Sequence, residues 1–317
     1  MKRKICAVLL IVLLLIQSAA ALPAALIPGG NTVGIELLTD GLIVTGVEPD
    51  SPAANAGLRE GDRIAEANGS PVETISALQA LVQDGNAVVL NVLREGRQAA
   101  FLLTPAPTED GHRLGLYLKD HIAGIGTVTY YDPLTGDFGA LGHGVSDPVS
   151  GKLLDISGGV LVASAITEIE RGRPGRPGLL RGSFTQETIL GTVEKNREHG
   201  LFGTVTSLPN QKALPVAQPS EIRLGDAFIL SNVEDDQVEA FKIRIDRVFP
   251  DAENGRNLLL TVTDEKLLDK TGGIVQGMSG SPIIQNGKLI GAVTHVLVNA
   301  PEMGYGTFLT TMLDAAA

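Results

Sequence analysis

The chain has 317 residues, which is enough for two domains, and its 44% hydrophobic and 19% charged residues exclude a disordered protein. The formal net charge of −11 argues against nucleic acid as the main partner, because phosphate binding needs a basic surface. The only cysteine, Cys6, lies near the N-terminus, so the rest of the chain has no internal disulfide and no cysteine-based metal site. The 38 glycines and 17 prolines favour many turns and therefore a strand-rich fold.

The N-terminus has the pattern of an export segment. Met1–Lys4 is basic, Ile5–Ile16 is an unbroken apolar run, and Ala19–Ala21 offers a small-residue cleavage site, which is the order found in secretory signals. Without cleavage, the apolar stretch would continue to Leu22 and would be barely long enough to cross a membrane. We therefore expect residues 1–27 to be a signal peptide or a membrane anchor, with the remainder exported.

Residues 28–107 alternate short strand patterns with turns and two short helices. Strand patterns at 33–38 and 42–47 precede a helix that ends at Gly57, and Asn68-Gly69 is a strong hairpin turn. Apolar residues at helical spacing predict a second helix over Thr74–Gln83.

A motif in this segment resembles a known domain. Ser51–Ile64 closely resembles the S-P-A-x-x-A-G-L-x-x-G-D-x-I signature of bacterial PDZ domains, which are β-sandwich-like. The resemblance implies a peptide groove between the strand that starts near Ile35 and the helix Thr74–Gln83, where a bound peptide adds a strand to the sheet. It also implies that backbone N–H groups of Val33, Gly34 and Ile35 hold a C-terminal carboxylate. The alternative is a groove that only docks against the neighbouring domain.

Residues 108–317 consist of strand patterns and turns throughout. Short runs of β-branched residues are bounded by Gly, Pro, Asn or Asp, and no long amphipathic helix is present in the sequence. An all-β segment of this length indicates a barrel or a pair of barrels. We therefore expect a mainly β protein in which a PDZ domain is followed by a trypsin-like double β-barrel.

The sharpest chemical motif is Gly277-Met278-Ser279-Gly280-Ser281-Pro282. Glycines on both sides of Ser279 leave its hydroxyl uncovered and let the backbone approach a substrate closely. The motif resembles the G-x-S-G-x-P of trypsin-like peptidases, in which the N–H groups at the positions of Gly277 and Ser279 form the oxyanion hole. The alternative is a tight turn built from small residues.

A serine hydroxyl needs a base, and the chain has five histidines. His143 is flanked by Gly142 and Gly144 in a turn and precedes Ser279, which is the order of a chymotrypsin-type triad. His295 lies in an apolar strand pattern and is more typical of a core or rim histidine. Three histidines lie in polar, turn-like contexts and are expected to be solvated: His112, His121 and His199.

The third member of a triad is an acid that orients the imidazole. Asp264 is the candidate, in the segment Val262–Lys270 that precedes the serine motif. From the sequence alone, the stronger interpretation is that Thr263 or Asp264 is the N-cap of a short helix.

Two longer segments resemble the SpoIVB sporulation peptidase family: Ala140–Gly144, and Thr271–Lys288 around the serine. The resemblance implies a catalytic set of His143, Asp264 and Ser279, and no metal or organic cofactor. It implies an enzyme in the intermembrane space of the forespore that cleaves itself and a membrane-associated regulator, so that a late mother-cell sigma factor becomes active. The expected partners are a protein substrate at or near a membrane and the enzyme's own N-terminal region.

Two other functions stay open at this point. A PDZ-containing quality-control protease of the cell envelope is disfavoured by domain order, since such enzymes usually carry the PDZ domain after the protease. A non-catalytic PDZ binding protein on an inactive barrel is disfavoured by the complete motifs around His143 and Ser279.

Overall fold

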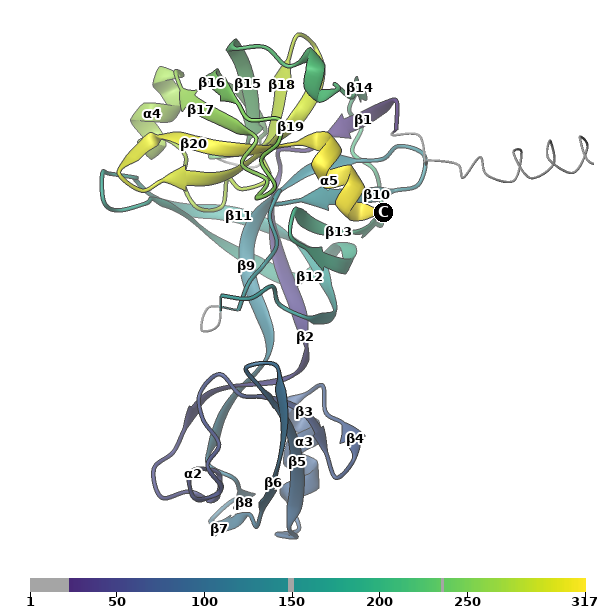
Figure 1. The fold of residues 1–317 in the computed structure, drawn as a ribbon, viewed down its shortest axis with the longest axis vertical. Coiled ribbons are helices and arrows are strands. Elements are labelled where there is room, and N and C mark those ends of the chain that lie inside the picture. Colours follow the sequence, from purple (N-terminus) through teal and green to yellow (C-terminus); the bar gives the residue numbers. More distant parts are fainter. Residues whose placement is uncertain (1–22, 148–150, 235–236) are drawn as a thin grey trace, which may run out of the picture.

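The computed structural model describes residues 23–147, 151–234 and 237–317. Strands dominate these residues, so the mainly β fold expected from the sequence is confirmed. Figure 1 shows a larger body and a smaller unit beneath it. Two long strands run from one to the other: β2 (Thr32–Val47) and β9 (Leu116–Tyr131).

The first half of the larger body is a ring of six antiparallel strands. The ring runs β2, β9, β10 (Asp137–Ala140), β13 (Gly200–Val205), β12 (Leu179–Arg197) and β11 (Ile156–Glu170), and β11 pairs again with β2. Alternating apolar residues of these strands fill its interior, including Val33, Leu37, Phe138, Leu161 and Leu201.

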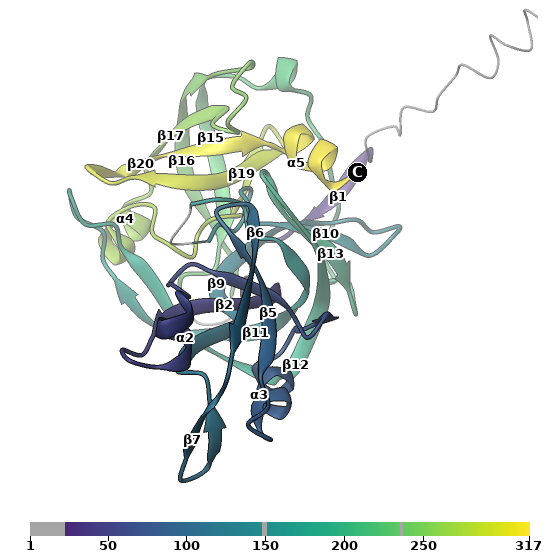
Figure 2. The ribbon, with the colours of Figure 1, turned by 60° about the horizontal axis from the view of Figure 1, so that its bottom comes forward.

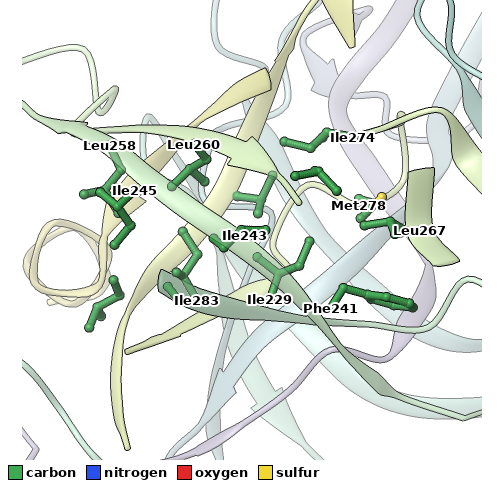
Figure 3. Packing of buried hydrophobic residues seen from close by; sticks show 14 of the residues in the cluster. Ile229, Phe241, Ile243, Ile245, Leu258, Leu260, Leu267, Ile274, Met278 and Ile283 are labelled. Carbon is green, nitrogen blue, oxygen red and sulfur yellow. The ribbon is translucent and has the colours of Figure 1, made fainter. Parts of the chain in front are cut away.

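The second half is a closed barrel of six strands: β15 (Gly225–Ser231), β16 (Glu239–Val248), β17 (Leu258–Val262), β20 (Ala300–Phe308), β19 (Lys288–Leu297) and β18 (Pro282–Gln285). Its core is the cluster drawn in Figure 3, which includes Phe241, Ile243 and Ile283. The helix α4 (Glu265–Thr271) follows β17 and contributes the buried Leu267. Two six-stranded barrels confirm the double-barrel architecture.

The smaller unit is the expected PDZ domain, seen from its free end in Figure 2. Its sheet continues from β2 through β3 (Arg63–Ala67) and β5 (Val88–Arg94) to β6 (Arg97–Leu103), with β4 (Ser70–Pro71) paired to β3. The helices α2 (Pro52–Ala56) and α3 (Ile75–Val82) and the hairpin β7 (Ala106–Thr108) and β8 (Gly111–Arg113) complete it.

The PDZ signature holds this unit together through local hydrogen bonds. Ser51 caps α2, and Gly57 ends it in the left-handed conformation. The buried carboxylate of Asp62 accepts the N–H of Arg59 and two N–H groups of the Arg94 guanidinium. The signature residues therefore fix the helix and the turn into β3.

The PDZ unit is inserted into the first barrel rather than placed before it. The first half of β2 pairs with β11 and β9 in the barrel, and the second half pairs with β3 and β9 in the PDZ unit. Residues 32–39 therefore belong to the barrel, and 116–119 belong to the PDZ unit. This division differs from the expected boundaries of 28–107 and 108–317.

The two ends of the described chain meet beside the barrels. The strand β1 (Ala25–Pro28) pairs with β14 (Leu214–Pro215) and with β9. The C-terminal helix α5 (Leu309–Ala316) buries Leu309 and Met312 in the same small cluster as Leu26. A short 3₁₀ turn over Pro219–Glu221 leads into β15.

The expected export segment, residues 1–27, lies almost entirely outside the described residues. Its last residues, Ala25–Ile27, belong to β1. Across residues 23–317, apart from the two short gaps, no helix has the length and apolarity needed to cross a membrane.

Candidate active site

Ser279 lies in a tight turn immediately before β18. Gly277 and Gly280 have φ angles of 100° and 98°, which L side chains rarely adopt. A Cβ atom on Gly280 would lie 2.0 Å from the carbonyl oxygen of Thr127. The glycines of the motif are therefore required by the backbone, both for its angles and for its close approach to β9.

Thr127 of β9 ties this turn to the first barrel. Its N–H donates to the carbonyl of Ser279 (3.0 Å), and its hydroxyl donates to the carbonyl of Gly277 (2.8 Å). Its own carbonyl accepts the N–H of Leu141 (3.1 Å), two residues before His143. Thr127 is fully buried. One residue thus positions the serine turn and the histidine turn against each other.

Strand β9 holds the carbonyl groups of Gly277, Ser279 and Gly280, whereas two N–H groups of the turn have no partner in the described chain. The N–H groups of Gly277 and Ser279 have no acceptor among the described residues. The other four between residues 276 and 281 donate to the backbone carbonyls of Gly178, Val275, Met278 and Val293. A turn with two unpaired donors beside a serine is suited to bind a developing oxyanion.

His143 follows β10 in a turn that requires unusual backbone angles. Leu141 and Gly142 both have φ of 68°. The Nδ1 atom of His143 lies 2.9 Å from the carbonyl oxygen of Gly144. A carbonyl can only accept, so Nδ1 carries the proton and Nε2 keeps its lone pair. Burial lowers the pKa of His143, and the Gly144 carbonyl opposes this shift.

Ser279 bonds to Thr294, a residue that lines one cavity with His143, but Ser279 and His143 are not hydrogen-bonded to each other. The Oγ of Ser279 donates to the carbonyl of Thr294 at 2.8 Å. Thr294 and His143 both line a cavity of about 430 Å³, together with Gly144, Ser146 and His295. The structure therefore brings the predicted nucleophile and base to neighbouring positions, with the serine hydroxyl turned toward β19.

His295 is a neighbour of His143 that the sequence pattern placed in the core or at its rim. The centroids of the two rings are 5.1 Å apart, and the planes are inclined by 40°. The pKa of His295 falls to about 4, because of desolvation and the nearby charges of His143 and Arg256. Both imidazoles at the site therefore favour the neutral form near neutral pH.

Asp264 is not brought to His143. It caps α4: one carboxylate oxygen accepts the N–H of Leu267, and the other accepts the N–H of Lys242, both at 3.2 Å. The only described hydrogen-bond partner of the His143 ring is Gly144. The structure thus gives Asp264 the capping role that the sequence also allowed. Among the described residues, no group of three or more His, Cys, Asp and Glu side chains is placed to hold a metal.

The position expected for carboxylate capture is corrected by the structure. Val33, Gly34 and Ile35 lie in the barrel part of β2, paired with β11 on one side and with β9 on the other. Val33 and Ile35 are buried in the barrel core. A strand with a neighbour on each side has no free edge for a peptide, so these residues cannot form the PDZ groove.

The groove of the PDZ unit lies instead between α3 and the start of β9. A cavity of about 490 Å³ is lined by Ile75, Leu78 and Val82 of α3 and by the segment from His112 to Lys119. Leu114 and Gly115 are buried, yet their N–H groups have no acceptor among the described residues. The helix predicted over Thr74–Gln83 therefore does line the groove, but with a different strand.

The sequence held a signal for this loop that lay outside the expected PDZ boundaries. Leu114-Gly115-Leu116 is an apolar–Gly–apolar triplet directly before a strand, and Gly115 has φ of 77°. Thr127 and Thr294, by contrast, are ordinary strand residues in the sequence. Only the three-dimensional contacts identify them as part of the site.

Family comparisons agree with this architecture. Residues 110–313, well over half of the chain, match the family described as SpoIVB peptidase S55. The chain belongs to the SpoIVB peptidase S55 family. In this SpoIVB-type chain, residues 43–95 also match a PDZ domain. That segment excludes Val33–Ile35 and agrees with the position of the inserted unit.

Individual relatives match over short stretches. A probable periplasmic serine endoprotease DegP-like of Chlamydia trachomatis is 45% identical over 76 residues, which are 22% of this chain and 15% of that protein. The magnetosome formation protease MamE of Magnetospirillum gryphiswaldense is 38% identical over 96 residues, 28% of this chain and 12% of that protein. A PDZ domain crystal structure of an SdrC-like protein from Listeria monocytogenes is 23% identical, covering 26% of this chain and 90% of that chain, with a TM-score of 0.24. The chain therefore spans less than a quarter of the length of these two proteases.

Proposed function

We propose that this chain is an exported serine endopeptidase with Ser279 as the nucleophile and His143 as the general base. The observation that carries the proposal is the serine turn: its carbonyls are fixed on Thr127, and the N–H groups of Gly277 and Ser279 are unpaired. The neutral imidazole of His143, with Nε2 available, lines the adjacent cavity. Membership in a peptidase family supports the same chemistry.

The reaction begins when the serine hydroxyl leaves Thr294 and donates to Nε2 of His143. The Oγ atom bonds to the substrate carbonyl carbon as its proton moves to His143, and the oxyanion accepts the N–H groups of Gly277 and Ser279. His143 then protonates the leaving amine as the C–N bond breaks. Water attacks the acyl-enzyme, gives its proton to His143 and releases the new carboxylate as Ser279 recovers its hydrogen.

The resting hydrogen bond of Ser279 sets a requirement on this cycle. Because the hydroxyl donates to the carbonyl of Thr294, it must rotate before His143 can accept its proton. A substrate N–H that bonds to the Thr294 carbonyl would compete with the hydroxyl and favour this rotation. In this proposal the carbonyl of Gly144, not a carboxylate, holds the tautomer of His143 in the resting enzyme.

The biological setting follows from the family resemblance and the N-terminal sequence. The basic and apolar pattern of residues 1–22 supports export, and the DegP-like relative is named as periplasmic. The proposed role is to cleave the chain itself and a membrane-associated regulator in the forespore intermembrane space, so that a late mother-cell sigma factor becomes active. The inserted PDZ unit supports a protein substrate or partner.

Two measurements on the full chain test the catalytic proposal. We expect a fluorophosphonate to label the wild-type protein, and we expect both Ser279→Ala and His143→Ala to abolish labelling. Self-cleavage, followed by mass spectrometry, is expected in the wild type and not in Ser279→Ala. Labelling that persists in Ser279→Ala would assign the nucleophile elsewhere, and a folded wild-type protein that takes no label would favour a non-catalytic PDZ binding protein.

A further inference from the structure

The strand β9 offers an open edge between the PDZ groove and the active site. One edge of β9 pairs with β2 along residues 116–127. The same edge pairs with β1 at Tyr130 and Tyr131, and the other edge pairs with β10 only, at residues 128–131. From Leu116 to Ile125, no described strand pairs with this second edge.

Alternation along the strand shows which backbone groups face the open edge. Thr127 directs its N–H and C=O away from β2, toward Ser279 and Leu141. Backbone direction alternates along a strand, and the register from Thr127 to His121 is unbroken. Ile125, Ala123 and His121 therefore present their N–H and C=O groups to the same side as Thr127. A second extended chain could bond to them.

Three cavities follow this edge in series. The PDZ groove shares Thr45, Ile75, Leu118 and Lys119 with a second cavity of about 710 Å³. The second cavity extends along β9 to Ala123 and shares Ser146 with the cavity that contains His143. These cavities therefore line the open edge of β9 from the PDZ groove to His143.

The loop at the far end of this path is suited to hold a chain terminus. The N–H groups of Leu114 and Gly115 are unpaired among the described residues and lie next to the groove. Two adjacent free N–H groups form a concavity that binds an anion such as a carboxylate. The groove beside them is lined by Ile75, Leu78 and Val82, which favours an apolar last residue.

We propose that β9 acts as a ruler, which means that it sets the distance between the free C-terminus of a substrate and the peptide bond that is cut. A protein whose free C-terminus is held at Leu114–Leu116 lies along the open edge as an added strand and is cut about 10 to 12 residues from that C-terminus. The inference rests on the proposed function, because it assigns the substrate class of the same site. The added strand runs antiparallel to β9, so the chain leads from the groove toward Thr127.

The length of the ruler follows from strand geometry. From Leu116 to Thr127 the strand advances eleven residues, or roughly 36 Å at about 3.3 Å per residue. Thr127 is the residue that holds the carbonyl of Ser279. A peptide with its last residue opposite Leu116 therefore has the peptide bond near Ser279 about eleven residues upstream, and the fragment that carries the C-terminus stays in the groove.

Cut-site mapping on peptide pools tests the ruler. The full chain is incubated with a pool of 30-residue peptides that have randomised interiors and a C-terminal valine with a free carboxylate, and with the same pool as C-terminal amides. Mass spectrometry then locates the cuts. We expect cuts in the acid pool to cluster about 10 to 12 residues from the C-terminus, and cleavage of the amide pool to be at least about tenfold slower.

Proline substitutions on the open edge test the pairing itself. Ala123→Pro removes an N–H that faces the open edge and leaves the hydrogen bonds to β2 in place. We expect it to bring the acid-to-amide rate ratio close to one, whereas Ala123→Ser keeps the wild-type ratio. Thermal unfolding shows which of these variants are folded.

The outcomes separate the ruler from the catalytic proposal. Cuts at positions unrelated to the C-terminus, or equal rates for acid and amide pools, overturn the ruler and leave Ser279 as the nucleophile. Fluorophosphonate labelling of Ser279 without cleavage of either pool also overturns it. The absence of both labelling and cleavage overturns the proposed function, and the ruler with it.

Discussion

At the scale of single residues, Thr127 connects the two catalytic motifs. Its three hydrogen bonds reach Ser279, Gly277 and Leu141, and the side chain is fully buried. Thr129, two residues further along β9, makes a similar contact: its hydroxyl donates to the carbonyl of Gly280 at 2.8 Å. The two threonines thus form a matched pair in which only Thr127 contacts both turns.

We expect Thr127→Val to lower turnover more than it lowers stability. The change leaves the buried carbonyl of Gly277 without its donor, which costs about 1–3 kcal/mol of unfolding free energy. It also loosens the turn that carries the N–H groups of Gly277 and Ser279, so kcat should fall about 10- to 100-fold with little change in KM. Thr129→Val is the control, with a similar loss of stability and a smaller loss of kcat. Equal losses of kcat in both variants would contradict a special role for Thr127.

The pKa of His143 predicts the acid side of the pH profile. Burial lowers this pKa below its usual value of 6.5, and the base acts only when it is neutral. Activity should therefore be complete above pH 6.5 and should be lost as the pH falls through the lowered pKa. A plot of kcat/KM against pH checks this expectation. An acid limb centred at or above pH 6.5 would show that His143 is not desolvated as described.

Two substitutions of Asp264 distinguish a role as helix cap from a role in catalysis. Asp264→Ala removes the cap of α4 and should cost about 0.5–2 kcal/mol of unfolding free energy, whereas Asp264→Asn keeps a capping oxygen and should cost much less. Denaturant unfolding of both variants measures this difference, and equal stabilities would contradict the cap. A large loss of turnover in the stable Asn variant would assign Asp264 the orienting role that the family resemblance implies.

At the scale of elements, the sequence predicted the turns better than the strands. The Ser279 and His143 turns need glycine at fixed positions, so their local patterns were informative. The strand β2 was predicted as two strands, over 33–38 and 42–47, and Gly41 between them has φ of 92°. In the structure this site is an irregularity within one strand, and β9 pairs across it on both sides. Pairing between distant segments, which no local pattern records, decided the outcome.

The same limit explains the misplaced groove. Val33–Ile35 has the apolar–Gly–apolar pattern of a carboxylate-binding loop, and so does Leu114–Leu116. The two segments have the same local pattern, and only the strand pairing around each of them shows which one borders the groove. For Asp264, a helix cap and a catalytic acid require the same residue, and the local sequence does not distinguish them.

The strand β1 predicts how far the N-terminus can be shortened. Leu26 is fully buried and Ile27 is 5% exposed, and β1 pairs with both β14 and β9. Removing residues 1–27 should therefore cost about 3–6 kcal/mol relative to removing 1–22, from the loss of two buried aliphatic side chains. Urea unfolding of the two truncated proteins measures the difference. Equal midpoints would show that β1 contributes nothing to the barrel.

At the scale of the whole molecule, the inserted PDZ unit is an extension of one barrel hairpin. Leu38 of β2 and His121 of β9 are register partners just above the insertion. Replacing residues 39–120 with an Asn-Gly turn would therefore close an ordinary antiparallel hairpin. The barrel cores do not include the PDZ cluster, and of their buried residues only Ile43 would be removed.

We expect this excised protein to fold and to label with fluorophosphonate within a few-fold of the wild-type rate. The difference between acid and amide peptides should disappear, because the groove and the start of β9 are gone. Circular dichroism and labelling kinetics provide the two measurements. A protein that folds yet keeps its preference for free C-termini would place terminus recognition in the barrels.

The double connection through β2 and β9 has a kinetic consequence. A flexible tether would let a captured tail search for the catalytic cleft, but a continuous pair of strands fixes its direction and reach. The bound tail then reaches Ser279 at an effective concentration that is on the order of millimolar for short links. The cleft itself needs little affinity for its substrate, so proteins without an accessible terminus escape cleavage even when they carry a suitable peptide bond.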